Sequence, residues 1–154
     1  MLIFLDIDGV MVPAKGWKAP ELLQDGFPAF SSQAISVLQP LVAEGATVML
    51  TTSHKSNYSI QEWKEIFRKR GITIDKLGVL DKNVGNLNRR EEIMQWININ
   101  LDNDNFVIMD DDKSLNDLPA FLKAKLLLTS SHIGLKQGHL EHARELAAIP
   151  LSKV

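Results

Sequence analysis

The stretch MLIFLDIDGV, residues 1–10, decides the fold class of this chain. The apolar run at residues 2–5 is typical of a fully buried strand in a parallel sheet. Asp6 and Asp8 follow this run directly, and Gly9 lets the chain turn. Because ligands bind at the carboxyl ends of the strands in such a sheet, the stretch predicts a functional site immediately after the first strand.

Short apolar strands alternate with amphipathic helices along the rest of the chain. This alternation predicts an α/β fold of three layers, Rossmann-like, in which helices cover both faces of a central parallel sheet. Pro40 predicts a kink or a break in the first helix. We expect strands at residues 2–5, 46–50, within 72–80, at 106–109 and at 126–128, and helices after Ser31 or Ser32, after the Ser59–Glu62 capping box, after the Asn88–Glu91 capping box, at 118–121 and after Gly138.

Residues 11–30 hold too much proline and glycine for a regular element, so we expect a long loop or flap there. Long loops in compact domains often serve function. Trp17 lies in this loop, and two roles stay open for it: stacking on a base, or anchoring the loop to the domain.

Length and composition limit the classes of protein. The 154 residues fit one domain, and the net charge of −2 gives no overall positive field for nucleic acid. The absence of cysteine excludes thiol catalysis, disulfides and cysteine-bound zinc. No apolar run approaches the ~20 residues of a membrane span, and the N-terminus lacks the basic region of a signal peptide. We therefore expect a soluble, cytoplasmic protein with no membrane partner.

Three predicted strands end in polar, reactive side chains, at residues 6–9, 51–53 and 110–112. If the strands are neighbours, five carboxylates and three hydroxyls meet at one edge of the sheet. Crowded carboxylates repel one another and raise one another's pKa unless a cation lies among them. An all-oxygen acidic site suits a hard divalent ion such as Mg²⁺.

The same residues suit phosphoryl transfer. An aspartate can attack phosphorus and form an aspartyl-phosphate, while a second aspartate handles the proton of the leaving group. The hydroxyls after the second strand can donate hydrogen bonds to phosphoryl oxygens, and a basic side chain must balance charge in the transition state. The candidates for that cation are Lys55, Arg89 and Arg90.

Three motifs resemble those of the haloacid dehalogenase (HAD) superfamily, in the same order: LIFLDIDGV, VMLTTSHK and FVIMDDD. The resemblance implies a Mg²⁺-dependent phosphatase with a HAD-like fold. By the same resemblance Asp6 is the nucleophile and Asp8 the general acid and base. Asp110, helped by Asp111, would hold the metal together with Asp6 and the backbone carbonyl of Asp8.

Two positions stay open within this resemblance. The hydroxyl of the second motif is Thr51 or Thr52; we prefer Thr52, and we place Ser53 and Lys55 beside the substrate. The third motif is usually a lysine at the start of a helix, whereas NRREEIMQWI offers Arg89 or Arg90. A guanidinium still supplies charge, with the geometry of a fork.

A narrower resemblance rests on TTSHK, RREEIMQWI, VIMDDD and a late SHIGL. These runs are similar to the compact HAD domains of Swiss-army-knife RNA repair proteins. That resemblance implies a phosphorylated substrate that is a nucleic-acid end or a nucleotide. The chain also has no room for a large cap domain, and capless members often act on large or open substrates.

Two other functions remain open from the sequence. A receiver-type switch also combines an acidic Mg²⁺ site with a phosphorylated aspartate, but that aspartate follows a middle strand, whereas the best candidate here follows the first. A non-catalytic module on the same fold that binds phosphate or nucleic acid is the second alternative. Of the remaining residues, we expect Asp112 to be solvated or to cap a helix, and Trp63 and Trp96 to lie in the core. For His54 two roles stay open, facing the substrate or a structural role, of which we prefer the second.

Overall fold

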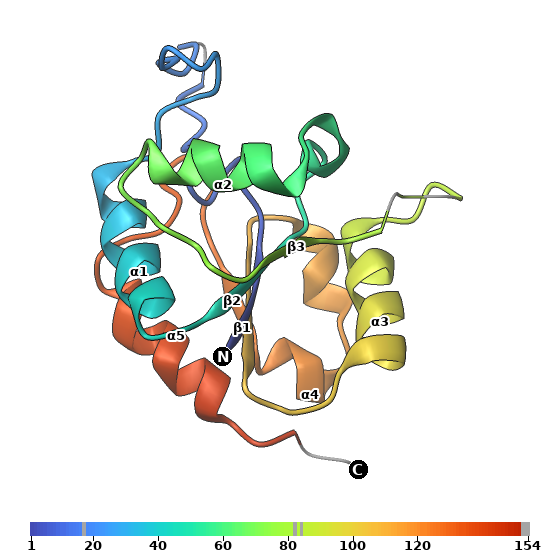
Figure 1. Ribbon diagram of the computed structural model, residues 1–154. Helices are drawn as coiled ribbons and strands as arrows, with labels where there is room; N and C mark the ends of the chain where they lie inside the picture. The colour runs from blue at the N-terminus through green and yellow to red at the C-terminus, as the bar shows by residue number, and fades with distance from the viewer. Residues whose placement is uncertain (17, 82, 84, 152–154) are drawn as a thin grey trace.

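The strands form one parallel sheet in the computed structural model, which describes residues 1–16, 18–81, 83 and 85–151. The order across the five-stranded sheet is β3-β2-β1-β4-β5, so the first strand lies in the middle (Figure 1). The predicted three-layer α/β, Rossmann-like fold is confirmed. The open question about Trp17 falls outside the described residues. The strand bounds are β1 Leu2–Leu5, β2 Thr47–Leu50, β3 Leu77–Val79, β4 Phe106–Asp110 and β5 Leu126–Leu128.

The register brings three strand ends to one level. Leu5 at the end of β1 pairs with Leu50 of β2 on one side and with Met109 of β4 on the other. The residues that follow Leu5, Leu50 and Met109 in the sequence therefore emerge next to one another at the carboxyl edge of the sheet. This register makes the three polar strand ends neighbours, as the sequence predicts.

The helices begin where the sequence places their caps. Ser31 caps the first helix, and complete capping boxes at Ser59–Glu62 and Asn88–Glu91 open the next two. None of the helices among the described residues has the length and apolarity needed to cross a bilayer. The bounds are α1 Ser32–Ala43, α2 Ile60–Arg68, α3 Arg89–Asn100, α4 Ala120–Lys123 and α5 His139–Ala148, with 3₁₀ turns η1 at Lys55–Asn57 and η2 at Lys113–Asp117.

Two local predictions differ from the structure. Helix α1 continues through Pro40 to Ala43 without a break. Because Pro40 lies in the last turn, its missing N–H removes one hydrogen bond close to the end of the helix. The short helix expected at 118–121 is instead η2 followed by α4, since Leu118 is extended and Pro119 caps the next turn.

Alternation along the strands divides the core into two parts. Ile3 and Leu5 of β1 face the layer of α1, α2 and α5, whereas Phe4 faces the layer of α3, η2 and α4. Trp63 is fully buried, as expected. Trp96 is only half-buried and packs edge-on against Phe4 at 5.3 Å between ring centroids.

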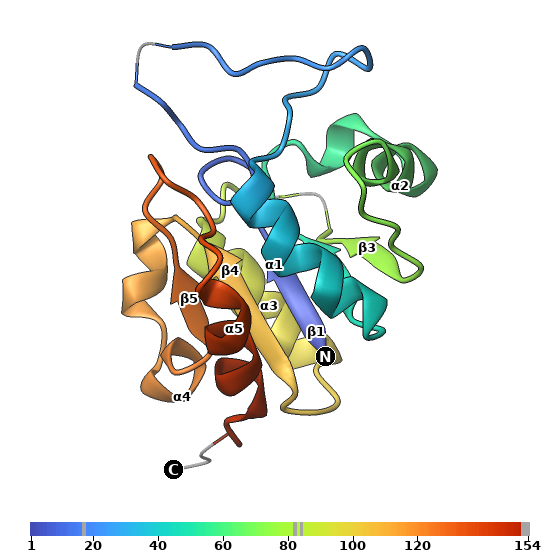
Figure 2. The same cartoon turned by 90° about the vertical axis from the view of Figure 1, so that its left-hand side faces the viewer.

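The 11–30 loop stands out from the carboxyl end of the sheet (Figure 2). Its described residues contain isolated bridges but no helix or strand. The base of the loop is tied to the turn after α2 through Arg70, whose guanidinium binds both carboxylate oxygens of Asp25 at 2.8 and 3.0 Å. The same guanidinium donates to the carbonyls of Phe27 and Pro28. Hydrogen bonds from Arg70 lower the pKa of Asp25 to about 2.

Replacing Arg70 by alanine tests this anchor. The substitution leaves Asp25 and the loop carbonyls without their buried donor, so we expect the free energy of unfolding to fall by about 3–5 kcal/mol. Denaturant unfolding measures the change. Arg68→Ala, which removes only an exposed pair with Glu65, is the control and should change stability little. Equal effects of the two substitutions would show that the anchor contributes nothing.

Candidate active site

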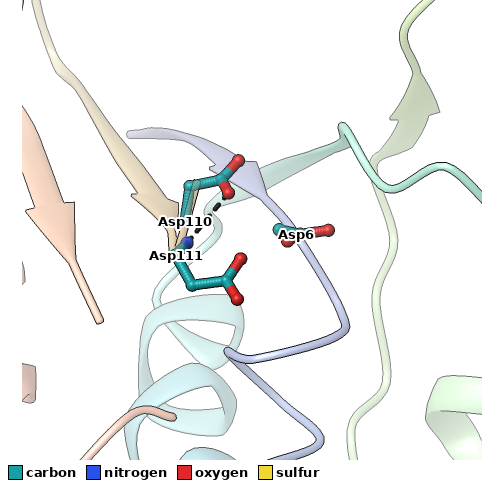
Figure 3. A group of neighbouring side chains, drawn as sticks. All are labelled: Asp6, Asp110 and Asp111. Atoms are coloured by element: carbon teal, nitrogen blue, oxygen red, sulfur yellow. Dashed lines mark hydrogen bonds between the residues drawn. The ribbon is translucent and has the colours of Figure 1, made fainter. Parts of the chain in front are cut away.

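Three carboxylates meet at the carboxyl edge of the sheet. Asp6 follows β1, Asp110 ends β4, and Asp111 is the next residue. One oxygen from each lies within 4.8 Å of the others. Figure 3 shows the carboxylates of Asp110 and Asp111 turned toward Asp6. The backbone N–H groups of Asp111 and Asp112 donate to Asp110 Oδ1 at 2.8 and 3.0 Å, which fixes that carboxylate.

Burial gives this group unusual electrostatics. Desolvation, and then the charge of Asp110, raise the pKa of Asp6 to about 8, although Arg89 opposes the rise. Desolvation also raises the pKa of Asp110, again against the effect of Arg89. The site therefore holds more negative charge than one guanidinium compensates, and a further cation would relieve the repulsion.

Arg89 is the basic side chain that reaches the carboxylates. Its Nη1 atom lies 2.6 Å from Asp110 Oδ2 and 3.4 Å from Asp6 Oδ1. Arg89 is the first residue of α3. The capping box at Asn88 fixes the start of this helix and therefore the position of the Arg89 backbone. Arg90 Nη1 contacts Met94 Sδ at 3.8 Å instead. Of the two arginines left open by the sequence, the structure brings Arg89 into the site and turns Arg90 along its own helix.

The two threonines of the second motif have different partners. The hydroxyl of Thr51, fully buried, donates to Asp110 Oδ2 at 3.5 Å and accepts from Arg89 Nη1 at 3.4 Å. Thr52 Oγ1 accepts the backbone N–H of His54 at 3.2 Å and closes the turn after β2. The contacts thus associate Thr51 with the carboxylates, where the sequence favoured Thr52. Ser53 is exposed at the rim of the same turn.

Lys55, which the sequence places beside the substrate, is paired with Glu92 rather than with the three aspartates. Its ammonium group pairs with Glu92 Oε2 at 2.9 Å, and both side chains are almost fully buried. The 3₁₀ turn that carries Lys55 is fixed by Trp63, whose Nε1–H donates to the Lys55 carbonyl. Glu92 Oε1 in turn lies 3.9 Å from Nε of Arg89. Lys55 therefore contacts the site indirectly, through Glu92 and Arg89.

Asp8 lies in a different environment from Asp6. Its side chain is 60% exposed and its Oδ2 atom is 2.8 Å from Nε2 of His54. The acidic group formed by Asp6, Asp110 and Asp111 does not include the Asp8 carboxylate. Sequence reasoning missed the contact with His54. The parallel register of β1 and β2 was the signal for it, because that register brings residues 6–9 and 51–54 to the same edge.

Gly9 occupies a position where any other residue would be strained and would displace the Asp111 side chain. Its φ is +78°, and a Cβ atom there would lie 1.9 Å from Asp111 Oδ2. Its carbonyl accepts from Thr129 Oγ1 at 2.7 Å, a contact that the sequence did not suggest. The turn after β1 is thus held by the segment that follows β5, and it lies directly beside the acidic group.

The donor set fits a magnesium ion. Asp6, Asp110 and Asp111 offer hard carboxylate oxygens close together, as this ion prefers. Thiolate and imidazole ligands are absent from the group, which disfavours zinc.

The fold and the site together define a HAD-like α/β domain of the type associated with phosphatase-type hydrolases. Asp6 and Asp8 follow the central strand, hydroxyls follow its neighbour on one side, and paired acids follow its neighbour on the other. The family model described as "HAD domain in Swiss Army Knife RNA repair proteins" matches residues 2–140, and the chain belongs to this family. No curated protein matches the chain.

The raised pKa of Asp6 predicts how the metal-free protein responds to pH. The unfolded carboxyl ionises near 3.8 and the folded one near 8, so the folded state loses stability as pH rises between these values. We expect Asp6→Asn to make this decline shallower and to raise the unfolding temperature at pH 8. Thermal unfolding in a chelator from pH 5 to pH 8 measures both effects. Asp117→Asn, which removes an exposed carboxylate, is the control; parallel declines for Asp6→Asn and wild type would contradict the prediction.

Proposed function

We propose that this protein is a Mg²⁺-dependent phosphomonoester hydrolase that forms an aspartyl-phosphate on Asp6. The observation that carries the proposal is the position of Asp6. Its carboxylate is buried at the end of the central strand, within reach of two further carboxylates and of one guanidinium. Membership of the HAD family supports hydrolase chemistry of this kind.

In the first step a carboxylate oxygen of Asp6 attacks phosphorus, and the bond from phosphorus to the leaving oxygen breaks. Asp8 gives its proton to that oxygen. In the second step Asp8 takes a proton from water, and the water oxygen attacks the phosphorus of the aspartyl-phosphate. The bond to Asp6 breaks, which releases phosphate and regenerates the carboxylate.

Other side chains support these steps. Arg89 and the Thr51 hydroxyl contact each other next to Asp6, and in this proposal they donate hydrogen bonds to the phosphoryl oxygens. Glu92 supports Arg89 and is itself paired with Lys55. Asp6, Asp110 and Asp111, with the backbone carbonyl of Asp8, would hold Mg²⁺, which supplies positive charge to the phosphoryl group when bound.

We further propose that the substrate is a phosphorylated nucleic-acid end or a nucleotide. The description of the family model, which refers to RNA repair proteins, supports this choice. The segment between β1 and α1 is the 11–30 loop rather than a large cap domain, which leaves the edge of the sheet open to an extended substrate. Because the net charge is −2, such a substrate must be held by local contacts.

Phosphate release with Mg²⁺ tests the proposed reaction. We expect Asp6→Asn to lower turnover by about 10³-fold or more and to keep the fold, because the nucleophile is lost. The substrates are an aryl phosphate, a sugar phosphate, free nucleotides, and oligonucleotides with 5′ or 3′ phosphates, and Asp117→Asn is the matched control. A preference for oligonucleotide ends supports the proposed substrate, whereas a preference for sugar phosphates contradicts it. No release from any substrate, with Mg²⁺ still bound, would favour the phospho-switch or the non-catalytic binding module.

Magnesium binding is tested separately, without turnover. Asp110→Asn removes one of the three clustered carboxylates, and we expect Mg²⁺ affinity to fall by about 10–100-fold. Isothermal titration calorimetry of wild type, Asp110→Asn and Asp117→Asn gives the affinities directly. An unchanged affinity in Asp110→Asn would place the metal elsewhere.

A further inference from the structure

The contact between His54 and Asp8 has no part in the scheme above. His54 Nε2 lies 2.8 Å from Asp8 Oδ2 at the rim of the site. We infer that His54 is a positioning residue, which holds the Asp8 carboxyl group in the orientation that proton transfer to the leaving oxygen requires. This inference rests on the proposed function, because it assigns His54 a role in the acid–base step of that reaction.

The first argument is that His54 is itself held in place. Its backbone N–H donates to Thr52 Oγ1 at 3.2 Å within the turn after β2. Its imidazole ring packs edge-on against Phe27, with 6.2 Å between ring centroids. The ring is half-buried, so packing restrains the imidazole that contacts Asp8.

The second argument is that Phe27, which packs against His54, is itself held in place by core residues. Phe27 packs edge-on against Trp63 of α2 at 5.5 Å and against Tyr58 at 5.8 Å. The Phe27 carbonyl also accepts a hydrogen bond from the buried guanidinium of Arg70. Packed aromatic side chains and a buried ion pair thus lead continuously from α2 to His54.

The third argument concerns Asp8. A side chain that is 60% exposed would sample several rotamers if it had no partner, and ordering it during the reaction costs free energy. A hydrogen bond donated by Nε2–H to Oδ2 selects one orientation in advance. Within the described part of the chain, Oδ1 of Asp8 has no hydrogen-bond partner, which leaves it available for the leaving oxygen. Pre-organisation of this kind is a recognised contribution to catalysis.

The alternative is that the pair is an ordinary exposed ion pair without effect on the reaction. The leaving group distinguishes the two cases. An alkyl phosphate needs a proton on its departing oxygen, whereas an activated aryl phosphate such as p-nitrophenyl phosphate departs with little help. Loss of a residue that positions the acid must therefore lower kcat/KM selectively for the alkyl substrate. A general loss of structure lowers kcat/KM equally for both substrates.

The experiment measures kcat/KM of wild type and His54→Ala for an alkyl phosphate and for p-nitrophenyl phosphate. This parameter includes steps up to departure of the leaving group and excludes hydrolysis of the aspartyl-phosphate. We expect a fall of about 10-fold or more for the alkyl substrate, within the range of general acid catalysis, and about 3-fold or less for the aryl substrate. Asp8→Asn should show the same selectivity more strongly.

Pre-steady-state kinetics provides a second readout. Because Asp8 also activates water, His54→Ala should slow hydrolysis of the intermediate more than its formation from p-nitrophenyl phosphate. We expect a burst of p-nitrophenol in His54→Ala that is larger than in wild type. His54→Gln keeps an N–H donor close to the Nε2 position and should restore most of the alkyl activity.

The matched control is His142→Ala on α5, which removes an exposed histidine far along the chain from the site. This substitution should leave kcat/KM unchanged for both substrates. Equal losses for the two substrates in His54→Ala, or no loss at all, would overturn the inference while Asp6-dependent release in wild type upholds the proposed function. A wild type that releases phosphate from neither substrate, nor from the nucleotides and oligonucleotides above, overturns the proposed function, and the role of His54 with it.

Discussion

Charge compensation between Asp6, Asp110 and Arg89 is the interaction on which the rest of this site depends. Parallel pairing of β1 with β4 brings two buried carboxylates together at the sheet edge, where desolvation disfavours their ionised forms. Arg89 can approach both because α3 begins at that residue. Glu92, one turn later, is balanced by Lys55. The pairs connect four segments of the chain through alternating charges, and Arg89 and Lys55 each have a defined acidic partner.

The backbone around these charges is constrained as strongly as the side chains. Gly9 is strongly favoured as glycine, because its φ is positive and Asp111 occupies the space of a Cβ atom. Thr129 fixes the Gly9 carbonyl from the segment after β5. On the other side of the site, Arg70 and Phe27 fasten the base of the 11–30 loop to α2. Both the turn beside the acidic group and the base of the 11–30 loop are thus held by contacts with distant parts of the chain.

The two aspartates of the first motif differ in environment, and this difference agrees with the division of roles that we propose. Asp6 is buried among charges, and its pKa is raised to about 8 in the absence of a cation. Asp8, two residues later, is exposed and contacts a histidine. Pairs of carboxyl groups with contrasting surroundings are characteristic of sites that divide attack and proton transfer between two residues. The intervening Ile7 is fully buried in the core.

The sequence by itself determined the fold class, the strand ends, both capping boxes and the acidic residues of the site, because these depend on local periodicity and on short motifs. Only the tertiary structure decided which of several equivalent residues reach the acidic group. Thr51 rather than Thr52, and Arg89 rather than Arg90, contact Asp110, since the direction of a side chain depends on register and helix phase. Lys55 pairs with Glu92, which lies 37 residues away in the sequence, and His54 contacts Asp8, which lies 46 residues away. Such pairs form when strands and helices pack against one another, and the pattern of residues along the sequence does not show directly which of them will meet.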